Sequence, residues 1–495
     1  MLYPVRIKDR DRLLQTPRGK RILRPIVVIP LLCLLVLLIA PCAFRAMCIT
    51  RMPLVEEPFD PVPLLEVELP HAENAFTHYK AAMALIPPSD SVAWEVQDAL
   101  EKMVRDVVKH GWEMSTPELE QLLKDNEVAV AEFRQGAKLS RSLSSPLATR
   151  DAITTLTMQV ETMRHLPRVV VAMACRHMMQ GEYEEAWKLL HDVFRASGHA
   201  SQYSDLTARL TDQVMFSQAA WQLQQWAAGE SVTAEDLRTA RQQFQEAWKL
   251  HPPYSESLKV QYVTLLNSFD QMANMFMFAE SGEQWLYAHM EVSMLWVMGE
   301  PELNERALRF WLQNHLPFVD KEPWERPPMD SHELFFDASS ALTVNGAVIP
   351  VEEAAKAVQP SMISSLIPYF VKVMKAHDRQ LARYRVCVCV LAAQEYRRDH
   401  GNFPATLTDL VPKYLDKIPS DPYDDSPLKY RAEPAPPAVY SVYEDAIDNG
   451  GIDISFDEDN GIDGKDPLDL GYLLLKPGEK IPGLSPVEKT DTSGG

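Results

Sequence analysis

The sequence predicts a mainly α-helical protein that consists of a single N-terminal transmembrane helix, a helical-repeat-like array and a small α+β domain at the C-terminus. Three observations support this fold class. A long uncharged apolar run lies near the start of the chain, apolar residues then recur at helical spacing, and two short strand patterns follow the last long helix. With 495 residues, the chain is long enough for about three folded units.

Composition excludes several classes of protein. Apolar residues make up 46% of the chain and charged residues 24%, which is ordinary for a globular protein and rules out wholesale disorder, collagen and a transporter with many spans. The net charge is −20, although residues 1–24 hold eight basic and two acidic side chains. The remaining residues therefore carry −26, so we expect no nucleic-acid partner.

The apolar run at residues 25–44, PIVVIPLLCLLVLLIAPCAF, contains 20 residues and no charge. A helix of this length, at about 1.5 Å per residue, crosses the roughly 30 Å hydrocarbon layer once. Basic residues precede the run and carboxylates dominate after it, so the positive-inside rule keeps the N-terminus in the cytoplasm. We expect a single-pass protein of a bacterial inner membrane, with its body in the periplasm.

Two alternatives to a permanent anchor stay open. A cleaved signal peptide has a shorter apolar region, and no clean Ala-x-Ala site follows this one. The run Ile39–Cys42 is similar to a lipoprotein box, but Pro41 stands where that box has a small residue. A retained anchor fits both observations best.

Composition along the chain predicts seven segments. They are a basic cytoplasmic tail (1–24), the transmembrane helix (25–44), a proline-rich stalk (45–72), the helical array (73–316), a linker with a β-hairpin (317–350), a long helix with an α+β module (351–475) and a disordered tail (476–495). Asn345-Gly346 predicts the hairpin, because this pair supplies the two positive φ angles of a type I′ turn. Helices are expected over 351–357 and from about Ser361, with Pro368 breaking or kinking the second.

Two helices of the array carry clear apolar stripes. The stripe residues are Tyr183, Ala186, Trp187, Leu190, Val193 and Phe194 in the first, and Leu237, Ala240, Phe244, Ala247 and Trp248 in the second. Ser115-Thr116-Pro117-Glu118 is the predicted capping-box start of one helix and Thr233 the predicted N-cap of another, and Gly181 and Gly229 separate helical hairpins. The stretch Gly181–Leu190, GEYEEAWKLL, resembles the second half of a tetratricopeptide repeat. Such arrays bind another polypeptide on a concave face, and a closed bundle without a groove is the alternative.

Sulfur-containing residues are interpreted as core filling. Six methionines lie among aromatic residues between Met272 and Met298, where packing of irregular gaps is favoured over copper(I) ligation or a plastic partner groove. Cys387 and Cys389 are two positions apart on a predicted helix, so they point to different faces and should not bridge each other.

The C-terminal region contains AAQEYRRDHGNFPATLTDLVPKYLDKIPSDPYDDSPLKYR and then VYSVYEDAIDNGG. In order and spacing these motifs resemble the globular domain of the type II secretion system major pseudopilin, over about residues 376–475. The resemblance implies a helix laid on a small antiparallel sheet and a calcium ion in the loop after the YS strand. Asp445 and Asp448 lie in that loop, and Asp469 matches the aspartate that begins the final strand. Because the anchor lies far upstream and no prepilin cleavage site occurs, we do not expect the chain to assemble as a pilin subunit.

The acidic loop supports a calcium site independently. Residues 444–469 hold ten carboxylates and one lysine, interleaved with glycine and asparagine, and oxygen ligands on such turns suit calcium. Asp457, Asp459 and Asp463 have alternating spacing but lack the glycine and glutamate that complete an EF-hand loop. A solvated acidic loop is the alternative.

No catalytic or cofactor-binding residue is predicted. Motifs for nucleotide binding, serine hydrolysis and zinc chelation do not occur, and His332-Glu333 begins like a zincin motif but has Phe336 where the second histidine belongs. We therefore expect a membrane-anchored extracytoplasmic scaffold with a protein partner, stabilised by calcium, and not an enzyme. The alternatives are an extracytoplasmic metal-dependent hydrolase and an accessory subunit of a type II secretion or pilus-like machine.

Overall fold

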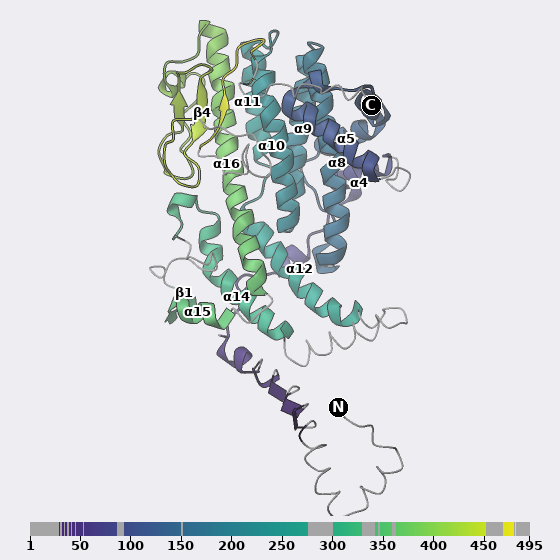
Figure 1. Ribbon diagram of the computed structural model, residues 1–495, viewed down its shortest axis with the longest axis vertical. Coiled ribbons are helices and arrows are strands. Elements are labelled where there is room, and N and C mark those ends of the chain that lie inside the picture. Colours follow the sequence, from purple (N-terminus) through teal and green to yellow (C-terminus); the bar gives the residue numbers. More distant parts are fainter. Residues whose placement is uncertain are drawn as a thin grey trace, which may run out of the picture. The chain divides into compact units, whose positions relative to one another are not determined.

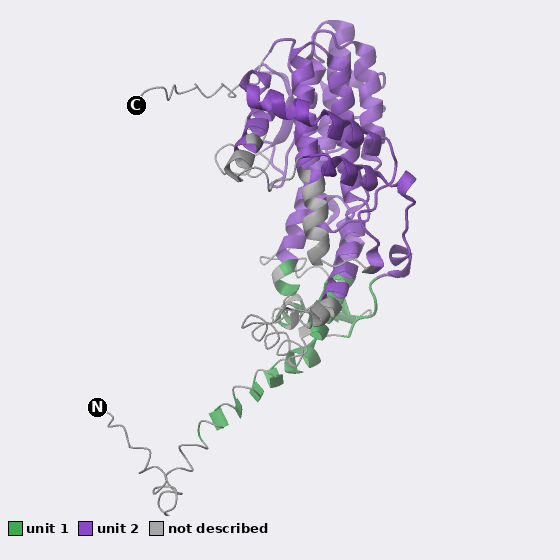
Figure 2. Ribbon diagram, turned by 90° about the vertical axis from the view of Figure 1, so that its right-hand side faces the viewer, with its two compact units in different colours: residues 1–58, 272–314, 340–366 green, residues 59–271, 315–339, 367–495 purple. Residues whose placement is uncertain are grey.

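The computed structural model describes residues 54–86, 94–149, 152–275, 300–328, 342–344, 347–358, 363–451, 469–479 and 481, together with scattered positions between 29 and 52. The chain forms two compact units, coloured separately in Figure 2. Unit 1 comprises residues 1–58, 272–314 and 340–366, and unit 2 comprises residues 59–271, 315–339 and 367–495. These boundaries differ from the expected segments, since the stretch 73–316 falls partly into each unit.

The described residues are mainly helical, as predicted (Figure 1). The α-helices are α3 (Val62–Leu65), α4 (Ala75–Ala84), α5 (Trp94–His110), α6 (Pro117–Asp125), α7 (Glu127–Ala137), α8 (Ala152–Met179), α9 (Tyr183–Ser201), α10 (Leu206–Ala228), α11 (Ala234–Trp248), α12 (Tyr254–Met275), α14 (Glu300–Val319), α15 (Val351–Val358) and α16 (Ile363–His400). Short 3-10 helices are η1 (His71–Glu73), η3 (Trp112–Met114), η4 (Leu147–Thr149), η5 (Pro323–Glu325) and η6 (Leu407–Leu410). The strands are β1 (Leu342–Val344), β2 (Ala347–Ile349), β3 (Lys429–Arg431), β4 (Ala438–Ser441) and β5 (Leu470–Leu473).

Helix ends follow the predicted local signals. Thr116 accepts a hydrogen bond from the amide of Leu119 at the start of α6, and Thr233 forms a reciprocal capping box with Asp236 at the start of α11. Gly401, with φ of 82°, ends α16 because its amide bonds back to the carbonyl of Arg397. The predicted helix start at residues 115–118 and the Thr233 cap are confirmed, but the capping box expected over Ser115–Glu118 is not formed, because Thr116 and not Ser115 is the N-cap.

Helices α8 to α11 lie side by side in unit 2 (Figure 1). The predicted stripes of α9 and α11 face the core: all members are buried except Tyr183 and Trp248, which are partly buried. Helix α10 differs because residues are buried on every face of it, polar ones included. It packs against α8 and α9, and its side chains also bond to α16. Helix α10 is therefore enclosed by the helices packed around it.

The C-terminal part of unit 2 is a helix with a small sheet beside it (Figure 1). Strands β3, β4 and β5 pair antiparallel in that order, with Val439 opposite both Tyr430 and Tyr472. Val439 and Tyr472 share a hydrophobic core with the buried segment Val386–Ala393 of α16. Gly471 is required in β5 because a Cβ atom there would lie 2.4 Å from the carbonyl oxygen of Val439. The two strand patterns expected after the last long helix, over residues 428–431 and 439–442, are confirmed as β3 and β4 within one residue.

In unit 1, β1 and β2 form the predicted antiparallel hairpin, with Val344 opposite Ala347. The Asn314 side chain ties α14 to this hairpin, since it accepts from the amide of Thr343 at 2.8 Å and donates to its carbonyl at 3.2 Å. Asn345 and Gly346 themselves lie outside the described residues. The hairpin is therefore held by a side chain of α14 as well as by its own ladder.

Pro368 was expected to break or kink a helix, and the break is not found. Helix α16 runs without interruption from Ile363 to His400 with Pro368 inside it. Pro368 is the sixth residue of α16, so it removes one intrahelical hydrogen bond, the one to the carbonyl of residue 364, near the N-terminal end of the helix. The cost of one lost bond is offset by the buried apolar face beyond it, which includes Phe370, Val371 and Val373.

Half of the predicted anchor, ten of its 20 residues, lies outside the described residues. Among the residues that the structure describes, no helix is both long and apolar enough to cross a bilayer. The methionine-rich stretch, the His332-Glu333 pair and the predicted tail also lie largely outside them, save Met272 and Met275 at the end of α12 and 476–479 and 481 of the tail. Cys387 and Cys389 are free and buried, as expected.

Candidate functional site

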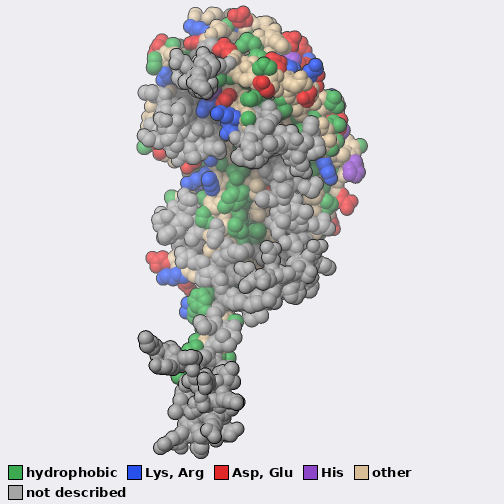
Figure 3. All heavy atoms as spheres, turned by 45° about the vertical axis from the view of Figure 1, so that its right-hand side comes forward, with side chains coloured by type: hydrophobic (Ala, Val, Ile, Leu, Met, Phe, Trp, Pro, Cys, Tyr) green, Lys and Arg blue, Asp and Glu red, His purple; other side chains and the backbone are tan. Residues whose placement is uncertain are grey.

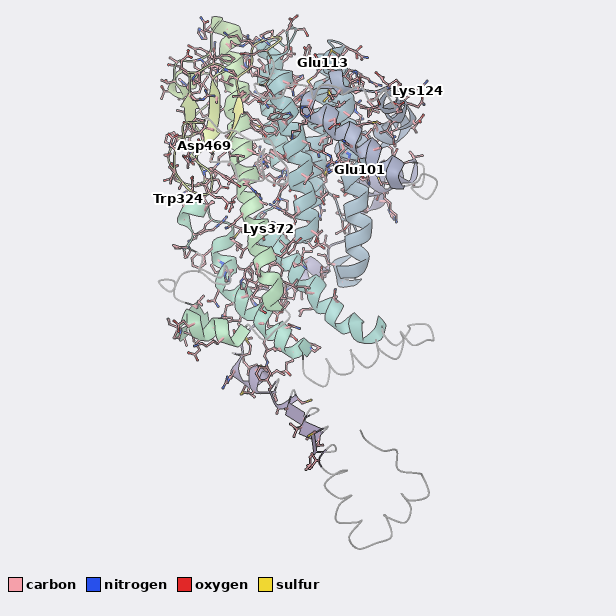
Figure 4. The ribbon with its side chains drawn as sticks, in the orientation of Figure 1. Glu101, Glu113, Lys124, Trp324, Lys372 and Asp469 are labelled. Carbon is pink, nitrogen blue, oxygen red and sulfur yellow. The ribbon has the colours of Figure 1, made fainter. Side chains whose placement is uncertain are left out.

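The sheet presents part of the predicted acidic loop. Residues 443–451 leave the end of β4, and Asp469 directly precedes β5 beside the sheet (Figure 4). The aspartate of the Asp421-Pro422 turn fixes this end of β4, since its carboxylate accepts from the Ser441 hydroxyl and the Val442 amide, both at 2.8 Å. Asp421 therefore fixes the start of the loop without a bound ligand.

The structure brings Asp445, Asp448 and Asp469 into one neighbourhood. Asp469 accepts from the amides of Asn449 at 3.4 Å and Gly451 at 2.8 Å. Asp448 accepts from the Gly450 amide and the Tyr440 hydroxyl, both at 2.9 Å. Asp445 accepts from the backbone of its own turn. Burial raises the pKa of Asp469, and the negative charges of Asp448 and Asp445 raise it further.

The ligand types at this loop suit a calcium ion, but the positions of its described carboxylates do not form a coordination site. The carboxylates are hard oxygen ligands that disfavour one another's charge, so a bound cation would relieve their repulsion. Within the described part of the chain, however, no three His, Cys, Asp or Glu side chains converge as metal ligands. Asp457, Asp459 and Asp463 lie outside the described residues. The three described carboxylates would have to turn from their present N–H donors to bind a metal ion.

A buried polar cluster at the centre of the bundle was not foreseen. His251 Nε2 lies 3.1 Å from Asp212 Oδ1 and 3.2 Å from Ser197 Oγ, and the side chains of all three residues are almost fully buried. The Gln380 amide donates to the same Asp212 oxygen at 2.8 Å. No sequence motif links these positions, which come from α9, α10, α16 and the turn after α11.

The cluster does not have the geometry of a catalytic relay. In a Ser-His-Asp relay the serine and the acid bind opposite nitrogens of the imidazole. Here both approach Nε2, while Nδ1 of His251 faces the carbonyl oxygen of Trp248 at 3.2 Å. Ser197 also donates to the carbonyl of Phe194 at 2.8 Å. The arrangement joins four segments of the bundle and presents no nucleophile to solvent.

A groove opens between the start of α9 and α11. This α9–α11 groove has a volume of about 530 Å³ and is lined among others by Tyr183, Glu184, Trp187, Lys188, Trp226 and Asp236. The two indole rings lie 4.6 Å apart and form its wall. Their N–H groups are fixed, because Trp187 donates to Gln243 Oε1 at 2.6 Å and Trp226 donates to the Tyr183 carbonyl at 2.8 Å.

The groove has an acidic rim. Glu182, Glu184 and Asp236 line it against one cation, Lys188, which bridges to Glu184 at 2.9 Å. Over the wider face of unit 2 shown in Figure 3, acidic and basic side chains are interspersed. The rim therefore favours a ligand that carries positive charge next to apolar surface.

Sequence analysis located the residues of the groove but not the groove. Tyr183 and Trp187 were recognised as an apolar stripe, and Gly229 as a boundary between hairpins. Trp226 and Gln243 carried no signal, because their contacts across the groove join α9 to neighbours 43 and 56 residues away. Comparisons with protein-family models, curated proteins and solved structures found no match to this chain.

Proposed function

We propose that this protein is a membrane-anchored extracytoplasmic scaffold that holds a basic polypeptide segment in the α9–α11 groove. The anchor is the apolar run at residues 25–44, and the positive-inside bias of its flanks favours a body outside the cytoplasm. A single-pass location in the inner membrane then places the groove in the periplasm. The groove is the observation that carries the proposal.

Its chemistry suits a polypeptide partner. Aromatic side chains with fixed N–H groups form a rigid wall, and aromatic residues are enriched at the energetic centres of protein interfaces. The carboxylates of Glu184 and Asp236 at the rim attract lysine or arginine and raise the rate of encounter. A basic residue flanked by apolar ones matches both features.

A photo-crosslinking experiment in membranes of the native host tests this proposal. A photoreactive amino acid at Thr239, which is exposed and lines the groove, should give a discrete adduct with one partner. The same amino acid at the exposed Gln242, on the same helix but outside the groove, is the matched control. Adducts at both positions, or at neither, would contradict the proposal.

Charge reversal provides a second test with a matched control. Glu184→Lys removes a rim carboxylate that is 87% exposed and pairs with Lys188. Glu246→Lys removes one that lies on α11 away from the groove, is 65% exposed and pairs with Lys249. Glu184→Lys should weaken formation of the Thr239 adduct severalfold, and Glu246→Lys should not. Equal effects of the two variants would count against binding through the acidic rim.

We also propose that the pseudopilin-like module is stabilised by calcium bound at the acidic loop. The proposal is supported by the neighbourhood of Asp445, Asp448 and Asp469 at the ends of β4 and β5 and by the resemblance of the motifs around them. Added calcium at 100 times its dissociation constant should raise the unfolding free energy by about 2.7 kcal/mol relative to chelator. Asp445→Asn should reduce that gain, whereas Asp416→Asn, an exposed control in the same module, should not. An identical melting temperature with calcium and with chelator would contradict stabilisation by calcium.

A further inference from the structure

A second, smaller pocket lies between the ends of α5 and α8. This α5–α8 pocket has a volume of about 190 Å³, somewhat larger than the roughly 150 Å³ of a cavity that holds benzene. Its walls come from the α5–η3 turn, the end of α8, the later part of α10 and the segment after β5. Apolar lining is supplied by Trp112, Met178, Tyr183, Leu475 and Ile481.

Gln222 contributes an unsatisfied acceptor to this pocket. The residue is fully buried, and its Nε2 donates to the carbonyl oxygen of Val108 at 2.5 Å. Since a backbone carbonyl oxygen only accepts hydrogen bonds, this bond must be donated by Nε2, and Gln222 Oε1 is then directed away from Val108. Gln222 Oε1 is buried and has no hydrogen-bond partner among the described residues. A buried acceptor without a donor is costly, and a ligand N–H group removes that cost.

A second buried atom without a partner lines the same pocket. His110 is the last residue of α5, and its Nδ1 is buried without a hydrogen-bond partner among the described residues. In the neutral tautomer that carries its proton on Nε2, this nitrogen is also an acceptor. Two residues that line the pocket therefore carry buried acceptors without a donor among the described residues.

The electrostatics of the walls favour a cation. Helices α5 and α8 both direct their C-terminal ends here, and a helix C-terminus carries partial negative charge. Glu113 and Glu479 add two carboxylates against a single lysine, Lys109. Glu113 lies at the bundle end in Figure 4. Burial raises the pKa of Cys175, which also lines the pocket, to about 12, so its thiol stays protonated and supplies no anion.

We propose that the α5–α8 pocket binds a small primary ammonium ion on a short apolar body, with an N–H group donating to Gln222 Oε1. The ammonium group satisfies the buried acceptors and is balanced by the two carboxylates. The apolar body lies against Trp112 and Met178. This site is distinct from the α9–α11 groove, although Tyr183 lines both.

Three probes of similar size and different charge test the site on the full-length protein in nanodiscs. At neutral pH, benzylammonium should bind at least about tenfold more tightly than benzyl alcohol or benzoate, because only the cation offers charge-assisted N–H donors. Dissociation constants are measured by ligand-observed NMR titration. Equal binding of the three probes, tighter binding of benzoate, or no binding of benzylammonium overturns the proposal.

Variants locate the binding. Gln222→Leu should abolish benzylammonium binding. Because this variant also loses the hydrogen bond to Val108, its circular dichroism spectrum is compared with that of the wild type to check that the helices remain folded. The double variant Glu113→Gln/Glu479→Gln keeps that bond and should weaken benzylammonium several-fold without changing benzyl alcohol. Glu120→Gln, an exposed carboxylate in a different pocket on α6, is the control and should change neither. Unchanged affinity in the double variant contradicts a cation site.

The same chemistry is found in free amines and in lysine side chains. Nα-acetyl-lysine amide, compared with benzylammonium, separates these sources. Tighter binding of the lysine derivative supports a protein ligand, and tighter binding of benzylammonium supports a free amine. Failure of both contradicts the site while leaving the proposed scaffold function intact, because that function rests on crosslinking from Thr239.

Discussion

Gly229 lies directly against the phenol ring of Tyr183: a Cβ atom on Gly229 would come within 2.3 Å of Tyr183 Cε1. The φ angle of Gly229 is −51°, so close approach and not backbone conformation requires glycine here. The Trp226 indole holds the same segment by donating to the Tyr183 carbonyl. Because Tyr183 lines both the α9–α11 groove and the α5–α8 pocket, this one contact sets the shape of both.

Gly229→Ala should therefore destabilise the protein by about 1–3 kcal/mol and displace the Tyr183 ring. We expect a lower denaturation midpoint together with weaker benzylammonium binding. Gly181→Ala is the control, since Gly181 has φ of 79° and open space around its missing Cβ. It should cost about 1–2 kcal/mol through backbone strain and leave probe binding unchanged. Parallel losses of binding in both variants would contradict the role of the contact.

Arg326→Leu should be strongly destabilising. Arg326 and Asp378 form a two-pronged ion pair at 2.5 and 2.8 Å, and both side chains are more than nine-tenths buried. Removing the cation leaves a buried carboxylate alone, at a cost of about 3–5 kcal/mol. The double variant Arg326→Leu/Asp378→Leu should recover much of the loss, because no buried charge remains. Chemical denaturation of the three variants checks this, and a double variant no more stable than Arg326→Leu would contradict it.

Asp192 should make stability depend on pH. Burial raises its pKa to about 6 from an ordinary 3.8, even though Arg134 Nε donates to it at 2.8 Å. A carboxyl with a raised folded pKa adds stability below its unfolded pKa, and this contribution disappears as pH rises through the folded pKa. The unfolding free energy of Asp192→Asn, taken relative to that of the wild type, should therefore increase by up to about 3 kcal/mol as pH rises from 4 to 6.

Unfolding free energies of both proteins across that range measure the difference. The two proteins must be compared, because the pH dependence of the wild type also contains the titration of His191 and His199. Burial lowers the pKa values of these histidines to about 4 and about 3. These histidines lose stabilisation as pH falls, which opposes Asp192. Parallel curves for wild type and Asp192→Asn would show that the Asp192 carboxyl does not titrate abnormally.

An engineered cysteine should report topology cleanly. Cys175 and Cys389 are buried, and burial raises the pKa of each thiol to about 12, so an impermeant maleimide should not label them. Lys124→Cys introduces an exposed thiol on α6. Intact cells should label this variant above the wild-type background, since we expect the body outside the cytoplasm. Labelling that appears only after the inner membrane is permeabilised would contradict the topology.

Local features of this chain were determined by short stretches of sequence. Thr116 and Thr233 cap helices, Gly401 ends α16, and β3 and β4 form where strand patterns predicted them, because capping and turn preferences depend on neighbouring residues. The loop holding Asp445 and Asp448 was also visible in the sequence. Its approach to Asp469 was suggested by a resemblance of motifs and is produced by the pairing of β4 with β5.

Only the tertiary structure decided how α10 is used. Its sequence has no apolar stripe, and its polar side chains find partners on α16, as Asp212 does with Gln380 across 168 residues. The α5–α8 pocket likewise needs Gln222 to meet the end of α5, 114 residues earlier in the chain. Helix signals act over one turn, whereas burial and pairing of a polar group depend on which distant segments fold against it. The sequence alone therefore predicted the elements and their ends, and packing created the sites between them.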